Sequence, residues 1–303
     1  MNDTTGSNER SLKLICTNGP VTSQIVIWNN LAFGIFNLCL TFATILLNFT
    51  TFFTYMKSKV LKAKMAYLMV TMLSVNDLIV GLTSNVLLSA VLLKEYSLRR
   101  TECLLNNIQI FLLLFLSGCS FKTLVVMSWE RYAAICHPLF HRTQVTRKRL
   151  MKCVTFLWSL ALVGTILSWQ FIAFFDYVII PELISFNVFL VYVYARIYQA
   201  NSKSPNAENR RRPDDAVNTA SEDQRRHVML NARLAKSSCL AVASFVLCYL
   251  PSCIITNGAF KFEDDLQTSV IVWAETLILA NSSVNSIVFL AKQTFKGTST
   301  CCF

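Results

Sequence analysis

The feature that most constrains this chain is a series of apolar runs, each long enough to cross a lipid bilayer as a helix. The runs lie at roughly 28–56, 65–93, 104–134, 152–171, 176–200, 235–257 and 267–290. A spanning helix needs about 20 mostly apolar residues. Helices and closed barrels alone satisfy every backbone group in hydrocarbon, and these runs are continuous rather than alternating. The sequence therefore predicts an all-α membrane protein with a seven-transmembrane helix bundle.

Composition supports a membrane protein and argues against several other classes. Hydrophobic residues make up 54% of the 303 residues and charged residues only 15%, which is too little charge for the surface of a soluble domain of this length. The net charge of +11 does not indicate a nucleic-acid partner, because the basic residues fall between the apolar runs. The eleven cysteines form no CxxC pair and no cysteine and histidine spacing suited to zinc.

Orientation is predicted from the loops, because lysine and arginine accumulate on the cytoplasmic side. Twenty of the 28 basic residues fall in the loops of one side. We therefore expect a multi-pass plasma-membrane protein with an extracellular N-terminal tail (1–27), a helical domain (28–290), and a cytoplasmic tail with a short amphipathic helix (291–303). The polar segment 201–227 is expected to be a flexible cytoplasmic loop.

Both ends of the chain carry candidate modification sites. Asn2 begins the sequence Asn-Asp-Thr, a glycosylation sequon, which agrees with an extracellular N-terminus. Cys301 and Cys302 follow a short basic segment, where palmitoylation would hold a helix on the membrane surface. Two unmodified cysteines are the alternative at the C-terminal end.

One charge pair stands at the end of the third apolar run. Glu130 and Arg131 follow about twenty-five residues of nearly unbroken apolar chain, and Tyr132 comes next. Ionisable groups at such a depth are costly to desolvate, so they serve as interfacial anchors or belong to a working site. The expected orientation puts this pair at the cytoplasmic end of the third helix.

Other polar motifs occur in the remaining helices. They are Asn48, Asp77, Trp158, Tyr194, the segment Cys248-Tyr249-Leu250-Pro251 and the segment Asn285-Ser286-Ile287-Val288-Phe289. With Glu-Arg-Tyr at 130–132, this order on seven spans resembles the rhodopsin-like, class A family of G-protein-coupled receptors. The run Met127 to Leu139 is most similar to the odorant-like and amine-like orphan branches. The similarity covers about residues 28–298.

The resemblance implies a receptor that senses an extracellular small-molecule ligand and activates a heterotrimeric G protein. Pro251 should bend the sixth helix into a hinge, with Tyr249 just before it. Outward movement of that helix would open a cleft for a partner helix. Arg131 would be held by Glu130 at rest and released toward Tyr194, and Leu139 would add an apolar contact to the G protein.

A polar core is expected around the carboxylate of Asp77 in the middle of the membrane. The resemblance surrounds it with oxygen-bearing side chains, those of Ser120, Asn281, Ser282 and Asn285. This group is expected to bind a hydrated Na⁺ that favours the inactive state. The alternative is a protonated Asp77 hydrogen-bonded to Asn48 and Asn285. No other cofactor is expected.

The ligand pocket should lie in the outer half of the bundle. Helical periodicity puts Glu275 on the inward stripe of Ser282 and Asn285, about 10–15 Å further out, where it is the candidate contact for a cationic ligand. Leu113 occupies the position at which amine receptors carry an aspartate, which favours a neutral or apolar ligand. Both ligand classes remain open.

A second buried charge requires a partner. Lys122 lies nine residues before Arg131, too deep to extend comfortably to the inner surface. Glu182 on the fifth helix is at about the same depth, so we predict an ion pair between the third and fifth helices. A structural role for this pair and a role of Lys122 in binding an anionic ligand are both open, and Glu182 is thereby also a ligand-site candidate.

Several positions depart from the family pattern. Only a few residues around Gln170 to Asp176 separate the fourth and fifth helices, and no cysteine lies between Cys153 and Cys239. The family's usual disulfide to the second outer loop is therefore absent, and Cys103 is expected to pair with Cys16 or to remain free. Tyr249, Ser286 and Phe289 replace residues that stabilise the active state in the family.

Two other functions are alternatives to a receptor. A transporter or channel would favour internal repeats with broken helices, and no such repeat is seen. A receptor-like protein that binds ligand without coupling is the other alternative. The sequence shows no pair of a nucleophile and a base that would indicate an enzyme. Membrane lipid is an expected partner, and a homo-oligomer remains open.

Overall fold

The protein is described by a computed structural model that covers residues 19–202, 239–251 and 264–300. Within these residues every regular element is a helix, apart from one isolated bridge between Pro20 and Arg100. The elements are α1 (Gln24–Lys57), α2 (Lys59–Ala63), α3 (Met65–Val80), the π-helix η2 (Gly81–Asn85), α4 (Val86–Leu98), α5 (Cys103–Cys136), α6 (Pro138–Gln144), α7 (Arg147–Gln170), α8 (Ile172–Phe174), the π-helix η3 (Phe175–Ile179), α9 (Ile180–Ser202) and α11 (Asp264–Thr300).

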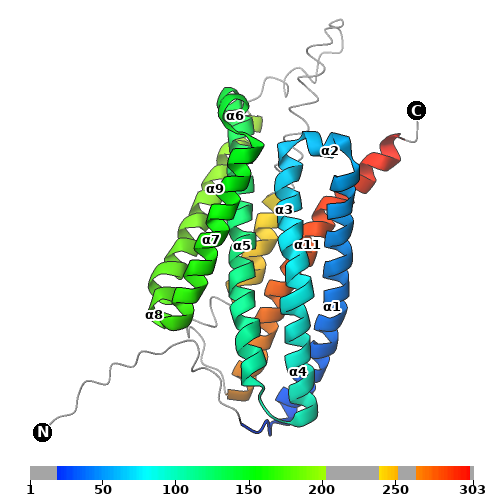
Figure 1. Cartoon of the computed structure of the whole chain (residues 1–303), viewed down its shortest axis with the longest axis vertical. Coiled ribbons are helices and arrows are strands. Elements are labelled where there is room, and N and C mark those ends of the chain that lie inside the picture. Colours follow the sequence, from blue (N-terminus) through cyan, green and yellow to red (C-terminus); the bar gives the residue numbers. More distant parts are fainter. Residues whose placement is uncertain (1–18, 203–238, 252–263, 301–303) are drawn as a thin grey trace, which may run out of the picture.

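Within the described residues, six helical segments are long and apolar enough to cross a membrane. They are α1, the continuous segment Met65–Leu98, α5, α7, Phe175–Ala200 and Asp265–Leu290. A shorter apolar helix, Cys239–Pro251, corresponds to part of the sixth expected span, and the rest of that span lies outside the described residues. The long helices lie side by side in one bundle (Figure 1). The predicted helical membrane bundle is thus confirmed.

Short helices mark the two ends of the bundle. The short helices α2 and α6 lie at one end, which we call the Arg131 end (Figure 1). Helix α8 and the end of α4 lie at the other, which we call the Cys103 end. At the Arg131 end, α6 begins at Pro138, where a proline is favourable because the first turn needs no backbone donor.

The expected polar loop and the expected C-terminal tail both begin differently in the structure. Helix α9 continues to Ser202, so residues 201–202 are helical, and 203–227 lie outside the described residues. Helix α11 runs without interruption to Thr300, so the expected C-terminal helix is the continuation of the seventh span. Asn2, Cys16, Cys301 and Cys302 lie outside the described residues.

The connection between α7 and α8 is as short as the sequence indicated. Helix α7 ends at Gln170 and α8 begins at Ile172, so Phe171 alone joins them. Cys103 is disulfide-bonded, which excludes the alternative of a free Cys103, and the six other described cysteines are free. The expected partner, Cys16, is not among the described residues. The bridge between Pro20 and Arg100 holds the start of the described chain beside the same end of α5.

A row of polar residues, all buried except the half-buried Glu95, joins α1 to η2, α4 and α11, and we call it the polar seam. Its members are Asn30, Asn37, Thr44 and Asn48 of α1, Asn85 of η2, Glu95 of α4, and Thr276, Ser282, Ser283 and Ser286 of α11. Hydrogen bonds cross it at several levels. Asn37 donates to Thr276 Oγ1 over 2.9 Å, and Ser286 donates to Asn48 Oδ1 over 2.5 Å. The packing of α1 against its neighbours is therefore specified largely by polar groups.

The other side of the bundle is built on apolar and aromatic contacts. Phe121 of α5 is 1% exposed and packs against Phe245 and Phe186, with ring centroids 4.7 and 5.9 Å away. Phe245 in turn stacks on Tyr249 at 3.8 Å. This aromatic group joins α5 to α9 and to the helix Cys239–Pro251.

Candidate functional site

The charge pair at the end of α5 is buried, and its two side chains are hydrogen-bonded to each other. Arg131 Nε donates to Glu130 Oε2 over 2.6 Å, and Arg131 Nη2 also bonds to the same carboxylate. The Glu130 side chain is 0% exposed and that of Arg131 is 4% exposed. Two charges so far from water are not snorkelling to a headgroup, which argues against the interfacial-anchor interpretation.

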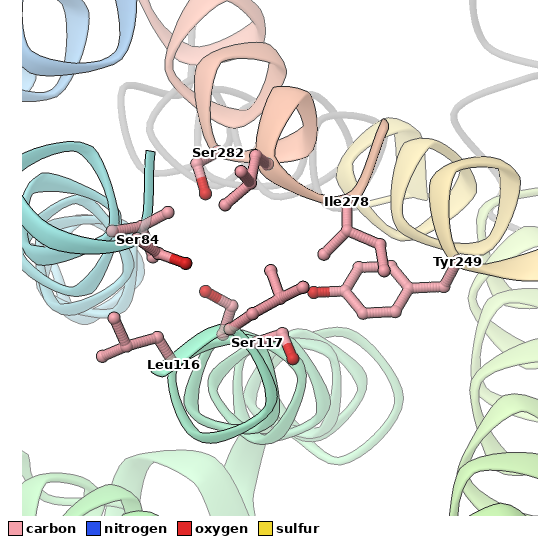
Figure 2. Close-up of a pocket in the computed structure, with 10 residues that line it drawn as sticks. Ser84, Leu116, Ser117, Tyr249, Ile278 and Ser282 are labelled. Atoms are coloured by element: carbon pink, nitrogen blue, oxygen red, sulfur yellow. The ribbon is translucent and has the colours of Figure 1, made fainter. Parts of the chain in front are cut away.

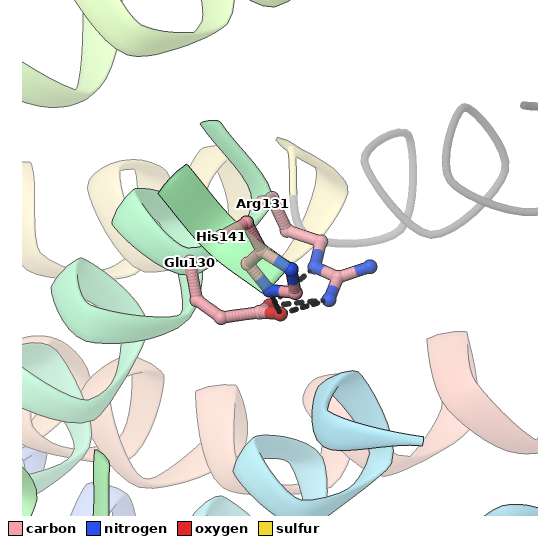
Figure 3. A network of polar contacts seen from close by, with 3 residues as sticks. All are labelled: Glu130, Arg131 and His141. Carbon is pink, nitrogen blue, oxygen red and sulfur yellow. Dashed lines mark hydrogen bonds and ion pairs between the residues drawn. The ribbon is translucent and has the colours of Figure 1, made fainter. Parts of the chain in front are cut away.

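A third residue completes this group, which we call the Glu130 cluster (Figure 3). His141 of α6 donates from Nε2 to Glu130 Oε1 over 2.8 Å. The contact crosses from the short helix after α5 back to the last turns of α5. Glu130 therefore accepts hydrogen bonds from two side chains, one permanently charged and one titratable.

The other residues predicted to form the switch lie around this cluster. Tyr132 is half-buried, and its hydroxyl lies 3.3 Å from His137 Nε2. Tyr194 of α9 bonds to Ser128 Oγ over 3.0 Å, one turn before Arg131. Leu139 on α6 is 77% exposed. An apolar side chain left free at this end is available to a partner.

The polar core forms at Asp77, which is fully buried in α3. Ser120 donates to one carboxylate oxygen over 3.1 Å, and Asn285 donates to the other over 3.2 Å. Asn285 Oδ1 is also buried and has no hydrogen-bond partner within the described residues. A carboxylate, nearby hydroxyls and an unpaired amide oxygen are ligands suited to a hard cation.

Two residues expected in this core bond elsewhere. Asn48 donates to the carbonyl oxygens of Thr44 and Ser282 and belongs to the polar seam, so the expected bond from Asn48 to Asp77 is not found. Asn281 Oδ1 accepts from Ser244 over 3.2 Å, which ties α11 to the helix Cys239–Pro251. Asn281 still lies one helical turn before Asn285 on α11.

A cavity lies directly beside the polar core, toward the Cys103 end (Figure 2). Its empty volume is about 220 Å³. The lining consists of Val80, Ser84, Leu113, Leu116, Ser117, Ser120, Tyr249, Ile278, Leu279 and Ser282. Figure 2 shows the oxygen atoms of Ser84, Ser282 and Tyr249 directed toward the space. The cavity is therefore lined by hydroxyl and apolar groups from four helical segments.

The π-helix η2 shapes this lining. Its extra residue per turn lets Ser84 and Asn85 both face inward, and both are 0% exposed. Ser84 Oγ has no hydrogen-bond partner within the described residues. A buried hydroxyl without a partner beside a cavity is a group that a bound molecule can satisfy.

The two ligand candidates of the outer half have different surroundings. Leu113 is 7% exposed and lines the cavity, as a pocket residue should. Glu275 does not line it. The carboxylate of Glu275 is half-buried on α11, within electrostatic range of Glu95 on α4. Glu275 therefore faces a second carboxylate at the edge of the polar seam.

Lys122 and Glu182 form an ion pair between α5 and α9, the arrangement that depth along the helices predicted. The Lys122 side chain is 8% exposed and that of Glu182 is 34% exposed. The ammonium nitrogen also lies 5.7 Å from the centre of the Phe186 ring. The charge of Lys122 is therefore already neutralised by the protein itself, which supports the structural role over the anion-binding role.

The hinge residues are described only up to Pro251, the last residue of the helix Cys239–Pro251. Tyr249, two residues earlier, contributes both to the cavity and to the aromatic stack. A bend at Pro251 is defined by the helix on both sides of it, and the residues after Pro251 lie outside those described.

Sequence reasoning missed His141 and most of the polar seam. The sequence did not point to His141 for two reasons. Histidine was taken as neutral when charges were counted, and His141 lies eleven residues after Glu130, on the next helix. The seam had a signal in the sequence, since Asn37, Thr41, Thr44, Asn48 and Thr51 follow one another at intervals of four and three. This spacing puts all five on one helix face.

Comparison with known proteins gives consistent results. Residues 47–178 match the model of the family described as 7 transmembrane receptor (rhodopsin family). The human olfactory receptor 51E1 is 34% identical over 87 residues, which are 28% of this chain and 26% of that receptor. The human motilin receptor is 47% identical over 50 residues, covering 16% of this chain and 12% of that receptor.

A longer alignment is found with the muscarinic acetylcholine receptor M3 of Pongo pygmaeus. It is 26% identical over 161 residues, which are 51% of this chain and 27% of that receptor. The aligned parts thus span about a quarter or less of the length of these relatives. The family match itself contains Asn48, Asp77 and the whole Glu130 cluster.

Proposed function

Because residues 47–178 match the rhodopsin family of seven-transmembrane receptors, we propose that this chain senses an extracellular small molecule and activates a heterotrimeric G protein. The observation that carries the proposal is the Glu130 cluster, in which Arg131 is buried and held by its neighbour. An arginine in such a position has two discrete partners available. It stays with Glu130 at rest, and it turns toward Tyr194 and a partner helix when the bundle opens.

The moving part of this switch is the helix Cys239–Pro251. It meets the bundle through the aromatic stack of Phe121, Phe245 and Tyr249 and through the bond between Ser244 and Asn281. Tyr249 lines the cavity, so a molecule bound there touches the moving helix directly. Such a ligand shifts the helix only if it binds one position more tightly than the other.

The cavity lining favours a small neutral ligand. It offers hydroxyl groups and aliphatic surface but no carboxylate and no ammonium. The space of about 220 Å³ includes the open mouth of the cavity, and the enclosed part has room for about one water-sized group, so a ligand must be small and must widen the cavity as it binds. A cationic ligand would need Glu275, which lies away from this lining. We therefore favour compounds that combine a hydroxyl or carbonyl group with a short apolar body.

Two substitutions separate the ligand classes in a screen on cells with verified surface expression. Leu113→Phe fills the cavity and should reduce the response to a neutral ligand by tenfold or more, since roughly 1.4 kcal/mol of lost binding corresponds to that factor. Glu275→Gln, the matched control, should leave the same response unchanged. A response that survives Leu113→Phe but is abolished by Glu275→Gln would refute the neutral ligand and support the cationic one.

A Na⁺ ion at Asp77 is proposed as an allosteric regulator of this receptor. Asp77, Ser120, Ser282 and the unpaired oxygen of Asn285 are the groups that would hold it. A cation here binds the arrangement with these groups close together, so it favours the resting state. Replacing Na⁺ with a large organic cation should then raise basal nucleotide exchange, and an unchanged basal rate would count against the ion.

The proposed location is the plasma membrane, with the N-terminus outside and the Arg131 end in the cytoplasm. The excess of basic residues in the loops of the Arg131 end supports this orientation. Glycosylation at Asn2 and palmitoylation at Cys301 and Cys302 remain parts of this proposal. Protease protection of the two ends in sealed vesicles tests the orientation directly.

The central test uses the switch itself and needs no ligand. Glu130→Gln removes the negative charge that holds Arg131, so it should raise nucleotide exchange by a G protein reconstituted with the purified chain. Removing Arg131 as well, in Glu130→Gln/Arg131→Ala, should return exchange to the rate of the G protein alone. Trp129→Phe on the neighbouring exposed position is the control and should behave like the unmodified chain. Equal exchange by all four proteins with each G-protein class would refute coupling.

One observation favours a second function, a receptor-like protein that binds ligand without coupling. Phe289 of α11 is 7% exposed and packs edge-on against Tyr67, with ring centroids 5.8 Å apart. It therefore supplies no hydroxyl to the rearranged switch. Saturable ligand binding together with unchanged nucleotide exchange in the test above would establish this alternative, whereas ligand-dependent flux in vesicles would indicate a transporter.

A further inference from the structure

The surface around α2 and the start of α7 carries positive charge without any acidic residue. Residues 57–64 contain four basic residues, residues 142–152 contain five, and neither segment contains an aspartate or a glutamate. Six of the basic side chains form what we call the α2–α7 patch, and all are exposed except Lys62, which is half-buried. None of the six pairs with a carboxylate within the part of the chain that the structure describes. The patch consists of Lys57, Lys59 and Lys62 in one half and Arg147, Lys148 and Lys152 in the other.

One hydrogen bond brings the two halves of the patch together. Arg147 donates from Nη2 to the backbone carbonyl oxygen of Lys62, close to the end of α2. A carbonyl oxygen accepts this bond without neutralising either charge, so two positively charged segments are held in contact. Arg149, by contrast, donates to the carbonyl and to the side chain of Gln144 at the end of α6. Arg149 therefore lies on the α6 side and is left out of the patch.

This arrangement is electrostatically unfavourable for the chain alone. The contact between α2 and α7 gathers like charges at one corner of the bundle, where they repel one another. Arg147 and Lys148 also occupy the first turn of α7, where the helix dipole is already positive and no acidic residue is present. A negatively charged group beside the patch removes both costs. The usual excess of basic residues in cytoplasmic loops does not explain the patch, because it requires no contact between two such loops.

Apolar side chains beside the charges indicate that the anion belongs to a lipid. Met56 at the end of α1, Val60 in α2 and Met151 in α7 are 47%, 66% and 45% exposed. The ammonium nitrogen of Lys57 lies 4.5 Å from the centre of the Phe53 ring, one turn back along α1. Lys57 is therefore directed toward the apolar span rather than away from it. Positive groups that alternate with exposed apolar side chains at the end of membrane spans suit a charged headgroup joined to acyl chains.

From this geometry we propose that the α2–α7 patch binds a membrane lipid whose headgroup carries at least two phosphate groups. Two phosphates are needed because the halves of the patch lie on different helices and each half lacks a counter-charge. Arg147, between the halves, has the planar set of donors that suits phosphate oxygens. The bound headgroup then holds α2 against the start of α7. The site is independent of G-protein coupling, and the proposed orientation enters only in assigning the lipid to the cytoplasmic leaflet.

The first test needs no variant. The full-length chain is purified in detergent micelles that contain a phosphatidylinositol bisphosphate, and native mass spectrometry counts the lipid molecules that stay bound. One such lipid per chain should be retained under conditions in which phosphatidylserine, added at the same total negative charge, is not. Equal retention of the two lipids would show that the patch responds to net charge alone and would overturn the proposal.

Two matched double variants locate the site. Lys62→Gln/Lys148→Gln removes one charge from each half of the patch. The dissociation constant of the bisphosphate lipid should rise about 25-fold, since each basic group beside an anionic lipid contributes about fivefold. Arg142→Gln/Arg149→Gln removes the same charge from the α6 side, where salt screens it from the headgroup, and should change the constant less than about threefold. Equal weakening by both pairs would contradict a site between α2 and α7.

A soluble competitor identifies the source of the phosphate groups. Inositol trisphosphate carries comparable phosphates without acyl chains, so it lacks the contact with the exposed apolar side chains. At the same concentration as the bisphosphate lipid, it should leave the retained lipid in place. If it displaces the lipid at equal concentration, the ligand is a free phosphate compound and the assignment to a membrane lipid fails.

Thermal unfolding gives a second reading and guards against variants that fold poorly. A ligand that binds only the folded chain raises its unfolding midpoint. The bisphosphate lipid should raise the midpoint of the unmodified chain and of Arg142→Gln/Arg149→Gln, and it should have little effect on Lys62→Gln/Lys148→Gln. A rise of the same size in all three proteins would refute the site. Because no G protein is used, a failure to stimulate nucleotide exchange would refute the proposed function and leave this inference standing.

Discussion

The two sides of the helix bundle are held together by different forces. On the side of α1 and α11, the polar seam bonds buried amides and hydroxyls to one another along most of the length of the helices. On the side of α9, the contact with α5 consists of the aromatic group around Phe121, the ion pair of Lys122 with Glu182, and the bond of Tyr194 to Ser128.

This difference indicates which side can rearrange. A directional hydrogen bond between two buried side chains fixes the register of the helices, because any sliding leaves a donor or acceptor unpaired. Aromatic surfaces tolerate small shifts, since their attraction depends little on exact position. We therefore expect α1 and α11 to act as a fixed frame, and α9 and the helix Cys239–Pro251 to move against α5.

The largest expected effect concerns the ion pair that ties α9 to α5. Glu182→Leu leaves the ammonium of Lys122, which is 8% exposed, without a counter-charge. Removing one partner of a buried pair costs about 3 kcal/mol or more. The midpoint of thermal unfolding in detergent should therefore fall markedly. Lys122→Met should cost less, because the remaining carboxylate is 34% exposed and is therefore partly hydrated.

The control for this prediction is the double variant. Lys122→Met/Glu182→Leu replaces both charges with apolar groups, so it should recover most of the lost stability. If the double variant is as unstable as Glu182→Leu, the loss comes from packing rather than from an unpaired charge. The sides of the bundle would then differ less than their contacts indicate.

A smaller effect is expected across the polar seam. The coupling between Asn37 and Thr276 is measured by a double-mutant cycle of Asn37→Leu and Thr276→Val. It should be about 0.6 kcal/mol and not above about 1.7 kcal/mol, because each side chain also finds backbone partners when the helices separate in the membrane. A coupling of zero at this pair would show that the seam fixes register without stabilising the bundle.

The sequence predicted the helices and the charged pairs well, for identifiable reasons. Membrane spans follow from hydropathy alone, and the depth of Lys122 left Glu182 as its natural partner on the fifth helix. Glu130 and Arg131 are adjacent in the chain, so their pairing needs no knowledge of the fold. These features depend on composition and on position along a helix, both of which the sequence states directly.

Features that depend on lateral packing were not predicted. The sequence could not show that Asn48 turns to α11 rather than to Asp77, because both directions lie within reach of one helix face. The inward position of Ser84 and Asn85 depends on η2, and nothing in Gly81–Asn85 marks a π-helix before its neighbours are known. The contact of His141 with Glu130 requires α6 to fold back on α5, which is likewise a tertiary result.

The smallest predicted effect compares two glycines, one on each side of the bundle. A Cβ at Gly34 of α1 would lie 2.9 Å from Cγ and Cδ2 of Leu93, so the side chain of Leu93 would have to move. A Cβ at Gly118 of α5 would meet Ala161 of α7 at 3.4 Å, an ordinary contact. Alanine favours the helix by up to about 1 kcal/mol at both positions.

Overpacking costs about 1–3 kcal/mol, and it lies near the lower end of that range at Gly34 because the side chain of Leu93 is flexible, so the cost equals or slightly exceeds that gain. Gly34→Ala should therefore lower stability by up to about 1 kcal/mol, whereas Gly118→Ala should leave it equal or slightly raised. Unfolding midpoints of the two variants, measured side by side in the same detergent, decide the matter. A stabilised Gly34→Ala would mean that α1 can move away from α4 without breaking the polar seam. The frame would then be as adaptable as the side that we expect to move.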